Sequence, residues 1–131
     1  SRIDIRNISA ALSFVNSCFR NEKQEKFKVI CIDSGFHIKS VADISAGGAR
    51  FTPVDFRELT KAVLNSGTDI VILAHNHPDS TNTPSQEDVT LTREVMRYMR
   101  CLGVTVLDHY ITGKNGTISM RNCGLIHDRE C

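Results

Sequence analysis

Two histidines one residue apart, followed by an aspartate, have the residue types and the spacing that metal chemistry requires. His75 and His77 end the apolar run TDIVILAHNH, and Asp88 comes after the loop PDSTNTP. Residues two apart on a strand point to the same face, so we expect the two imidazoles to project side by side, with Cβ atoms roughly 6.5–7 Å apart. Zn–N bonds are about 2 Å long, and two imidazoles at that separation can close on one ion.

Asp88 is the expected third ligand. The segment PSQED at residues 84–88 is typical of a helix start, with Ser85 as N-cap and Asp88 at the third helical position. That first turn brings the carboxylate back over the histidines, and two histidines, one carboxylate and a water form the open ligand set of a catalytic zinc site. Taken alone, the same residues allow other interpretations. Ser85 and Asp88 match a simple capping box, and either histidine can be a hydrogen-bonded core residue or a loop contact.

The histidine pair must lie at the open end of a strand, and the pattern around it predicts such a strand over residues 68–77. This run is apolar on both faces, and Pro78 ends it because proline cannot donate to a ladder. The other predicted elements are three helices and two hairpins, at about 3–20, 52–67 and 85–102 and at 27–45 and 104–120. Their order predicts an α/β fold with a central mixed β-sheet flanked by helices.

Local patterns also predict helix caps and core residues. The helix at 52–67 is expected to begin with Thr52 as N-cap and Pro53 in its first position. In the first helix, the apolar residues at helical spacing are predicted to lie on one face: Ile5, Ile8, Leu12, Val15 and Phe19. In the last helix, the residues predicted to be core are Val89, Val95, Met96, Met99 and Leu102. Three of the five cysteines lie in apolar patterns and are interpreted as core residues: Cys18, Cys31 and Cys101. The odd number of cysteines, the lack of a C-x-x-C pair and the lack of a recognisable secretory signal together predict reduced thiols.

The complete spacing H-x-H-x7-S-x2-D resembles the motif of the JAMM (MPN+) zinc metalloproteases. The strings HNHP, TPS and LDHYI are similar to those of the RadC branch, over about residues 25–120. The resemblance implies a JAB/MPN, cytidine-deaminase-like architecture and a Zn²⁺ ion held by His75, His77 and Asp88. RadC proteins usually carry a helix-hairpin-helix region as well, whereas one helix precedes the domain here. Asp79-Ser80 stands where RadC proteins usually have Ser-Gly.

The resemblance also implies a general base and an oxyanion donor. Glu25 matches the RadC glutamate before the first strand, and its parity agrees because it shares a strand face with Phe27. We expect Glu25 to take the proton of the attacking water and return it to the leaving amine. Ser85 is expected to donate a hydrogen bond to the oxyanion, a role that competes with helix capping for one hydroxyl. Without the resemblance, Glu25 is an exposed strand-start carboxylate, and Glu22 a solvated charge.

The remaining histidines are predicted to lie outside the ligand set. Asp108 and His109 are adjacent on a strand, so at most one of them faces the metal, and a supporting role is expected instead of ligation. His37 and His127 are interpreted as surface residues. The string HNH at 75–77 does not indicate an HNH nuclease, because those enzymes are named for residues scattered through a ββα-metal unit.

The motif and the resemblance leave three possible functions. We expect a zinc-dependent hydrolase of peptide or isopeptide bonds with a protein or peptide substrate. The first rival is a non-catalytic protein-binding module on the same fold, and the second is a DNA-repair-associated accessory protein, as the family's traditional label suggests. The net charge of +1 gives no general attraction to nucleic acid or anionic membranes. The stripe Arg93, Arg97 and Arg100 is interpreted as a solvated helix face. We expect no strong nucleic-acid binding.

Length and hydropathy complete the expectations. The 131 residues are expected to form a single domain, with its core at about 25–120. No apolar run is long enough for a transmembrane helix, and the start SRIDIRN is too polar for a signal peptide. A cytoplasmic protein without membrane association is therefore expected.

Overall fold

A computed structural model describes residues 2–47 and 53–127 of the chain. Eight elements follow one another in the order that the sequence predicts. They are α1 (Ile8–Cys18), β1 (Phe27–Ile32), β2 (Ile38–Asp43), α2 (Phe56–Ser66), β3 (Ile70–Asn76), α3 (Gln86–Cys101), β4 (Thr105–Gly113) and β5 (Gly116–Ser119). The predicted α/β class and the mixed sheet flanked by helices are confirmed.

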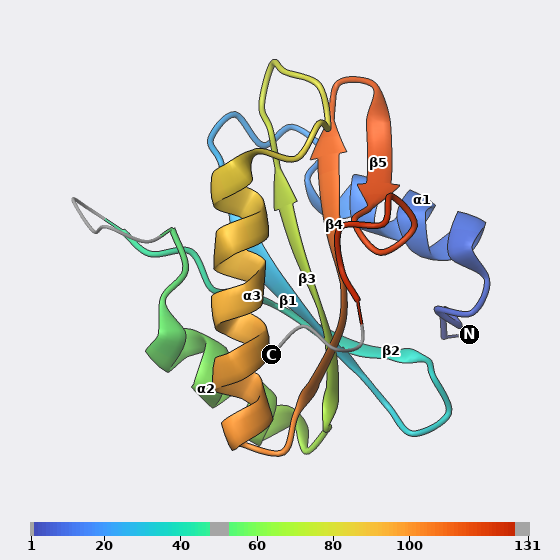
Figure 1. Cartoon of the computed structure of the whole chain (residues 1–131). Coiled ribbons are helices and arrows are strands. Elements are labelled where there is room, and N and C mark those ends of the chain that lie inside the picture. The colour runs from blue at the N-terminus through green and yellow to red at the C-terminus, as the bar shows by residue number, and fades with distance from the viewer. Residues whose placement is uncertain (1, 48–52, 128–131) are drawn as a thin grey trace.

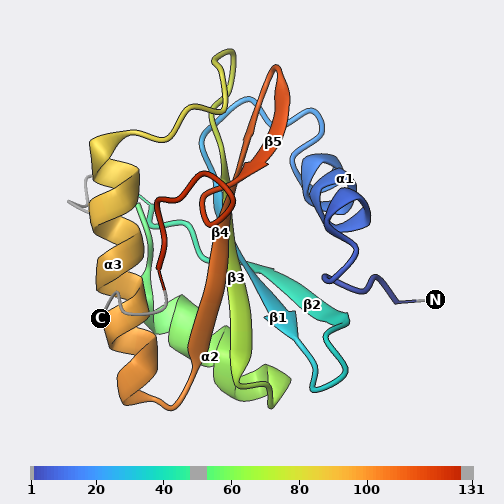
Figure 2. The same ribbon diagram turned by 45° about the vertical axis from the view of Figure 1, so that its right-hand side comes forward.

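The five strands form one sheet in the order β2-β1-β3-β4-β5. The central pair β3 and β4 is parallel, and every other pair is antiparallel. In Figures 1 and 2, α2 and α3 cover one face of the sheet and α1 covers the other. A three-layer arrangement follows, in which the central strands must be apolar on both faces.

Alternation along β1 and β3 places their side chains in two core clusters, one on each face of the sheet. Phe27, Val29 and Cys31 pack with Leu59, Val63, Val95 and Met99 in the layer beneath α2 and α3. The intervening Ile30 and Ile32 pack with Ala11, Val15 and Phe19 beneath α1. Because β3 alternates in the same way, with Leu73 on the α3 side and Ile72 and Ala74 on the α1 side, His75 faces α3.

The first helix begins later than predicted. Asn7 is its N-cap, and the Asn7 side chain accepts a hydrogen bond from the Ala10 backbone N–H at 3.1 Å. Ile5 was predicted to lie on the helix but precedes it, because the Ile5 N–H donates to the Phe36 carbonyl of the β1–β2 hairpin at 2.9 Å. Ile8 is 40% exposed, so Ala11 and Val15 form the buried face of α1.

The N-cap of α2 is Asp55, whose side chain accepts from the N–H groups of Arg57 and Glu58. The prediction that the helix starts at Pro53 is wrong, and its predicted N-cap, Thr52, lies outside the described residues. Val54 forms a β-bridge with Ser45, and this tertiary pairing keeps the chain extended up to the aspartate. Gly67 ends the helix in the left-handed conformation, as the predicted stop requires.

In α3 the predicted core positions Val95 and Met99 are buried, and Val89 and Met96 are partly buried. Leu102 is instead the C-cap and is 42% exposed. Cys101 is also exposed, so its interpretation as a core residue is wrong, whereas Cys31 is buried and Cys18 half-buried. Within residues 2–47 and 53–127, none of the helices has the length and apolar character needed to cross a membrane.

Candidate metal site

His75, His77 and Asp88 come together at the end of β3. Their ligand atoms all lie within 4.8 Å of one another. The two histidine Nε2 atoms are 3.0 Å apart, the Asp88 Oδ1 atom lies 3.1 Å from His75 Nε2, and Asp88 Oδ2 lies 3.3 Å from His77 Nε2. The predicted set of three side chains therefore converges on one point.

His75 lies within β3, and His77 lies just after the strand ends. His75 is fully buried in the ladder opposite Phe27, and the two rings stack with centroids 4.3 Å apart. His77 lies one residue beyond β3, where its N–H donates to the Thr112 carbonyl at 2.7 Å and so extends the pairing with β4. The His77 side chain keeps 16% of its surface exposed, so the site opens on this side.

The capping box at the start of α3 positions Asp88. The Ser85 N–H donates to Asp88 Oδ2 at 2.8 Å, and the Asp88 N–H donates to Ser85 Oγ at 3.0 Å. Burial raises the pKa of Asp88, but His75, when its ring is protonated, and the hydrogen bonds from Ser85 outweigh burial and hold this pKa well below its usual range. The carboxylate at the site is therefore an anion.

The donor set fits a divalent cation. His77 Nδ1 lies 2.9 Å from the Thr81 carbonyl oxygen, which can only accept, so Nδ1 carries the proton and a neutral His77 presents a lone pair at Nε2. The Asp88 carboxylate is likewise an acceptor. These electron-rich atoms converge with His75 Nε2, and a cation with nitrogen and oxygen ligands satisfies all three.

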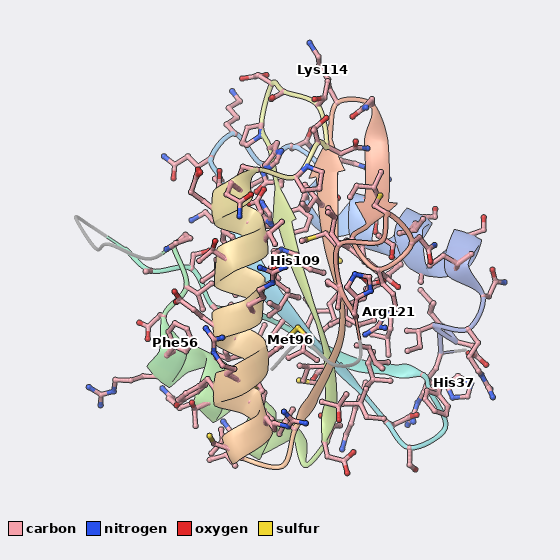
Figure 3. All side chains as sticks on the ribbon, in the orientation of Figure 1. His37, Phe56, Met96, His109, Lys114 and Arg121 are labelled. Atoms are coloured by element: carbon pink, nitrogen blue, oxygen red, sulfur yellow. The ribbon has the colours of Figure 1, made fainter. Side chains whose placement is uncertain are left out.

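The loop that provides the Thr81 carbonyl is anchored to the hairpin formed by β4 and β5. The Asn82 N–H donates to Asn115 Oδ1 at 2.9 Å, and the Asn82 side chain donates to the Gly116 carbonyl at 3.0 Å. The Lys114 N–H donates to the Ser80 carbonyl at 2.8 Å. Lys114, at the tip of this hairpin, is labelled in Figure 3. The orientation of His77 therefore depends on a hairpin far away in sequence.

Glu25 is exposed and lies two residues before β1. The Asn76 side chain holds the backbone on both sides of Glu25. It donates a hydrogen bond to the Gln24 carbonyl at 3.0 Å and accepts one from the Lys26 N–H at 2.7 Å. Phe27 pairs with His75, so the same antiparallel register extended by two residues would set Glu25 opposite His77. The backbone thus agrees with the predicted face of Glu25, and its role as general base stays a prediction.

Ser85 can act as a helix cap and still donate a hydrogen bond. In the capping box its Oγ atom accepts from the Asp88 N–H, and this interaction uses a lone pair. A hydroxyl has one proton to donate in addition to two lone pairs. The Ser85 side chain is exposed, so its proton can point outward. The competition expected between the two roles does not arise.

A second layer of residues stands behind the ligands. His109 on β4 is fully buried, and its Nε2 atom lies 2.7 Å from His75 Nδ1, so it is outside the ligand set. Figure 3 shows it beside α3, where Thr92 Oγ1 lies 2.6 Å from its Nδ1. Burial holds the pKa of His109 well below its usual range. Asp108 faces the other way and binds Ser119 Oγ and the Arg121 N–H.

Several supporting residues were not predicted from the sequence. They are Phe27 as a stacking partner, Asn76, Thr81, Thr92, and Gly113, which has room for no side chain beside the backbone of the loop that holds Thr81. Only Thr92 had a local signal, because it lies one helical turn after Asp88. Of the other histidines, His127 is exposed as predicted. His37 lies at the β1–β2 hairpin with 36% of its side chain exposed, within 4 Å of two aspartates, Asp4 and Asp33.

The fold and the converging ligand atoms define a mixed α/β domain with a candidate metal site at the end of a central strand. A family model described as "RadC-like JAB domain" matches residues 5–125. The chain belongs to this family, and the sequence resemblance is confirmed.

Curated relatives agree with this family. The chain is 34% identical to UPF0758 protein STH371 of Symbiobacterium thermophilum, over 95% of this chain and 53% of that protein. It is 34% identical to UPF0758 protein Mbar_A2303 of Methanosarcina barkeri, over 82% of this chain and 47% of the relative. It is 36% identical to a UPF0758 protein of Syntrophomonas wolfei, over 82% of this chain and 46% of that protein. The chain thus spans about half the length of these relatives.

Proposed function

We propose that this domain is a zinc-dependent hydrolase of peptide or isopeptide bonds. The observation that carries the proposal is the convergence of His75 Nε2, His77 Nε2 and an Asp88 carboxylate at one partly open point. Over residues 2–47 and 53–127, no further histidine, cysteine or acidic side chain joins this group. Three protein ligands leave room for a water, which is typical of catalytic zinc sites, whereas structural sites are closed by four.

The chemistry divides among the side chains around this point. His75, His77 and Asp88 would hold the zinc ion, which lowers the pKa of a water and polarises the substrate carbonyl when bound. Glu25 accepts a proton from the attacking water as the water oxygen bonds to the carbonyl carbon. The Ser85 hydroxyl donates to the developing oxyanion. Glu25 then returns the proton to the amine nitrogen as the carbon–nitrogen bond breaks.

Metal analysis tests the first part of the proposal. Purified protein supplied with zinc should hold about one ion per chain. His77→Ala should lose most of this zinc and stay folded, because the core clusters do not include His77. His37→Ala is the matched control and should keep its zinc. If the wild-type protein takes up no zinc, the hydrolase proposal fails.

Hydrolysis tests the second part and separates an enzyme from a binding module. The probes are a fluorescence-quenched peptide library and a lysine isopeptide. Glu25→Gln keeps the shape of the side chain but cannot accept a proton, so hydrolysis should fall by roughly 10²–10⁴-fold with zinc content unchanged. Glu22→Gln is the comparison and should keep activity. Loss of zinc in Glu25→Gln would instead make Glu25 a ligand, and full activity in that variant would place the base elsewhere.

A further inference from the structure

A chain of buried hydrogen bonds runs from the start of α3 to the back of His75. Thr92 Oγ1 donates to the Asp88 carbonyl at 2.6 Å and lies 2.6 Å from His109 Nδ1. His109 Nε2 lies 2.7 Å from His75 Nδ1. All three side chains are buried, His75 and His109 completely. Asp88 is therefore linked to His75 in two ways. Its carboxylate lies directly beside the ring, and its backbone carbonyl is connected to the ring through this chain of hydrogen bonds.

The direction of each hydrogen bond follows from the first one. A threonine hydroxyl has one proton, and Thr92 Oγ1 lies 2.6 Å from both the Asp88 carbonyl oxygen and His109 Nδ1. A carbonyl oxygen can only accept, so at this distance it takes the Thr92 proton. Thr92 must then accept from His109, so the His109 proton is on Nδ1. A neutral histidine protonated at Nδ1 accepts at Nε2. A His75 proton is therefore on Nδ1, so a neutral His75 keeps a lone pair on Nε2, facing His77 and Asp88.

We propose that Thr92 and His109 are positioning residues that hold His75 in the one tautomer able to bind a metal ion through Nε2. This inference rests on the proposed zinc site and deepens it. A ligating histidine usually donates to a carboxylate, carbonyl or water. When the partner of the ligating histidine is another histidine, the direction of the hydrogen bond is not fixed, because either nitrogen of the partner can carry its proton. His109 can serve as the acceptor only because Thr92 defines its tautomer from the other side.

Thr92→Val should remove the hydroxyl that fixes the tautomer of His109, while it keeps the shape of the side chain. Without the hydroxyl, a proton on His109 Nδ1 has no acceptor, and a buried N–H without a partner is unfavourable. His109 should then carry its proton on Nε2 and donate it to His75 Nδ1. The His75 proton would move to Nε2, where it blocks the metal. Thr92→Ser keeps the hydroxyl and is the matched control.

Two measurements test the inference. In metal-free protein with ¹⁵N-labelled histidine, long-range ¹H–¹⁵N spectra should show His75 and His109 both protonated at Nδ1, and in Thr92→Val both at Nε2. In chelator competition, zinc affinity should fall about 10–100-fold in Thr92→Val, the usual cost of losing support for a ligand. Thr92→Ser should retain the wild-type affinity, and the melting temperature confirms that each variant is folded.

The outcomes distinguish this inference from the proposed function. His109 protonated at Nε2 in the wild-type protein, or unchanged zinc affinity in a folded Thr92→Val variant, would overturn the positioning role. A wild-type protein that binds no zinc would refute the hydrolase, while the tautomers in the metal-free spectra would still decide the direction of the hydrogen-bond chain.

Discussion

Gly113 is the position where one added methyl group should disturb both stability and metal binding. A Cβ atom there would lie 2.4 Å from the Asn82 nitrogen, 2.5 Å from the Thr81 carbonyl carbon and 2.7 Å from the Ser80 carbonyl oxygen. These are backbone atoms, so no side-chain rotation relieves the overlap, and the loop must move by about 1 Å to restore ordinary contact. That movement displaces the Thr81 carbonyl that orients His77.

The overlap and the weakened loop hydrogen bonds together set the size of the effect. Overpacking of this kind costs about 1–3 kcal/mol, and each weakened loop hydrogen bond, such as Lys114 N–H to Ser80 O, contributes about 1 kcal/mol. Alanine also restricts the unfolded chain, which returns about 0.4–1 kcal/mol. We expect Gly113→Ala to lower the free energy of unfolding by about 2–3 kcal/mol and to weaken zinc binding.

Urea unfolding and zinc competition measure the two effects. Gly47→Ala is the control, because a Cβ atom at Gly47 meets nothing within 4 Å. Its stability should stay within about 0.5 kcal/mol of wild type. The reasoning is refuted if Gly113→Ala matches Gly47→Ala in both unfolding and zinc affinity, because the loop would then not rest on the hairpin as described.

Three further predictions concern pH, the Glu25 segment and DNA. Burial, with Asp108 nearby, raises the pKa of Tyr110 to about 12. Because this lies above the unfolded pKa of about 10, the Tyr110 contribution to stability should be complete below pH 10 and lost as the pH rises toward 12. In urea titrations between pH 10 and 12, the free energy of unfolding should fall less in Tyr110→Phe than in the wild-type protein. Asn76→Ala should free the Gln24–Lys26 backbone, seen as faster Lys26 amide exchange, and should lower hydrolysis more than zinc affinity. DNA binding measured by fluorescence anisotropy should be weak and without sequence preference, and sub-micromolar affinity that survives 200 mM salt would contradict this.

The expected ligands were recognisable because their signals are local. Strand parity places His75 and His77 on one face, and the capping box places Asp88 at the start of α3. The order of the eight elements follows from hydrophobic periodicity and from the glycine and proline residues that end them. Each of these signals spans only a few residues, so no knowledge of the distant chain is needed to interpret it.

Caps and exposed positions needed tertiary information. Periodicity predicted Ile5 to lie on the first helix and Leu102 to be a core residue, but Ile5 pairs with the β1–β2 hairpin and Leu102 is an exposed cap. The α2 cap moved to Asp55 because Val54 bridges to Ser45. In each case a contact with a distant segment, or the end of the packing layer, outweighs a local preference.

Sequence alone thus determined the element order and the three candidate ligands, and tertiary structure decided what supports those ligands. The clearest example is His109. Strict alternation from Val106, which packs beneath α3, would turn Asp108 toward the site and His109 away from it. Instead Leu107 is an extra residue in β4, because Val71 pairs with Val106 while Ile72 pairs with Asp108. This bulge shifts the parity and turns His109 toward His75. The shift arises from pairing between strands that lie far apart in sequence. The alternation of residues along β4 alone carries no information about this pairing.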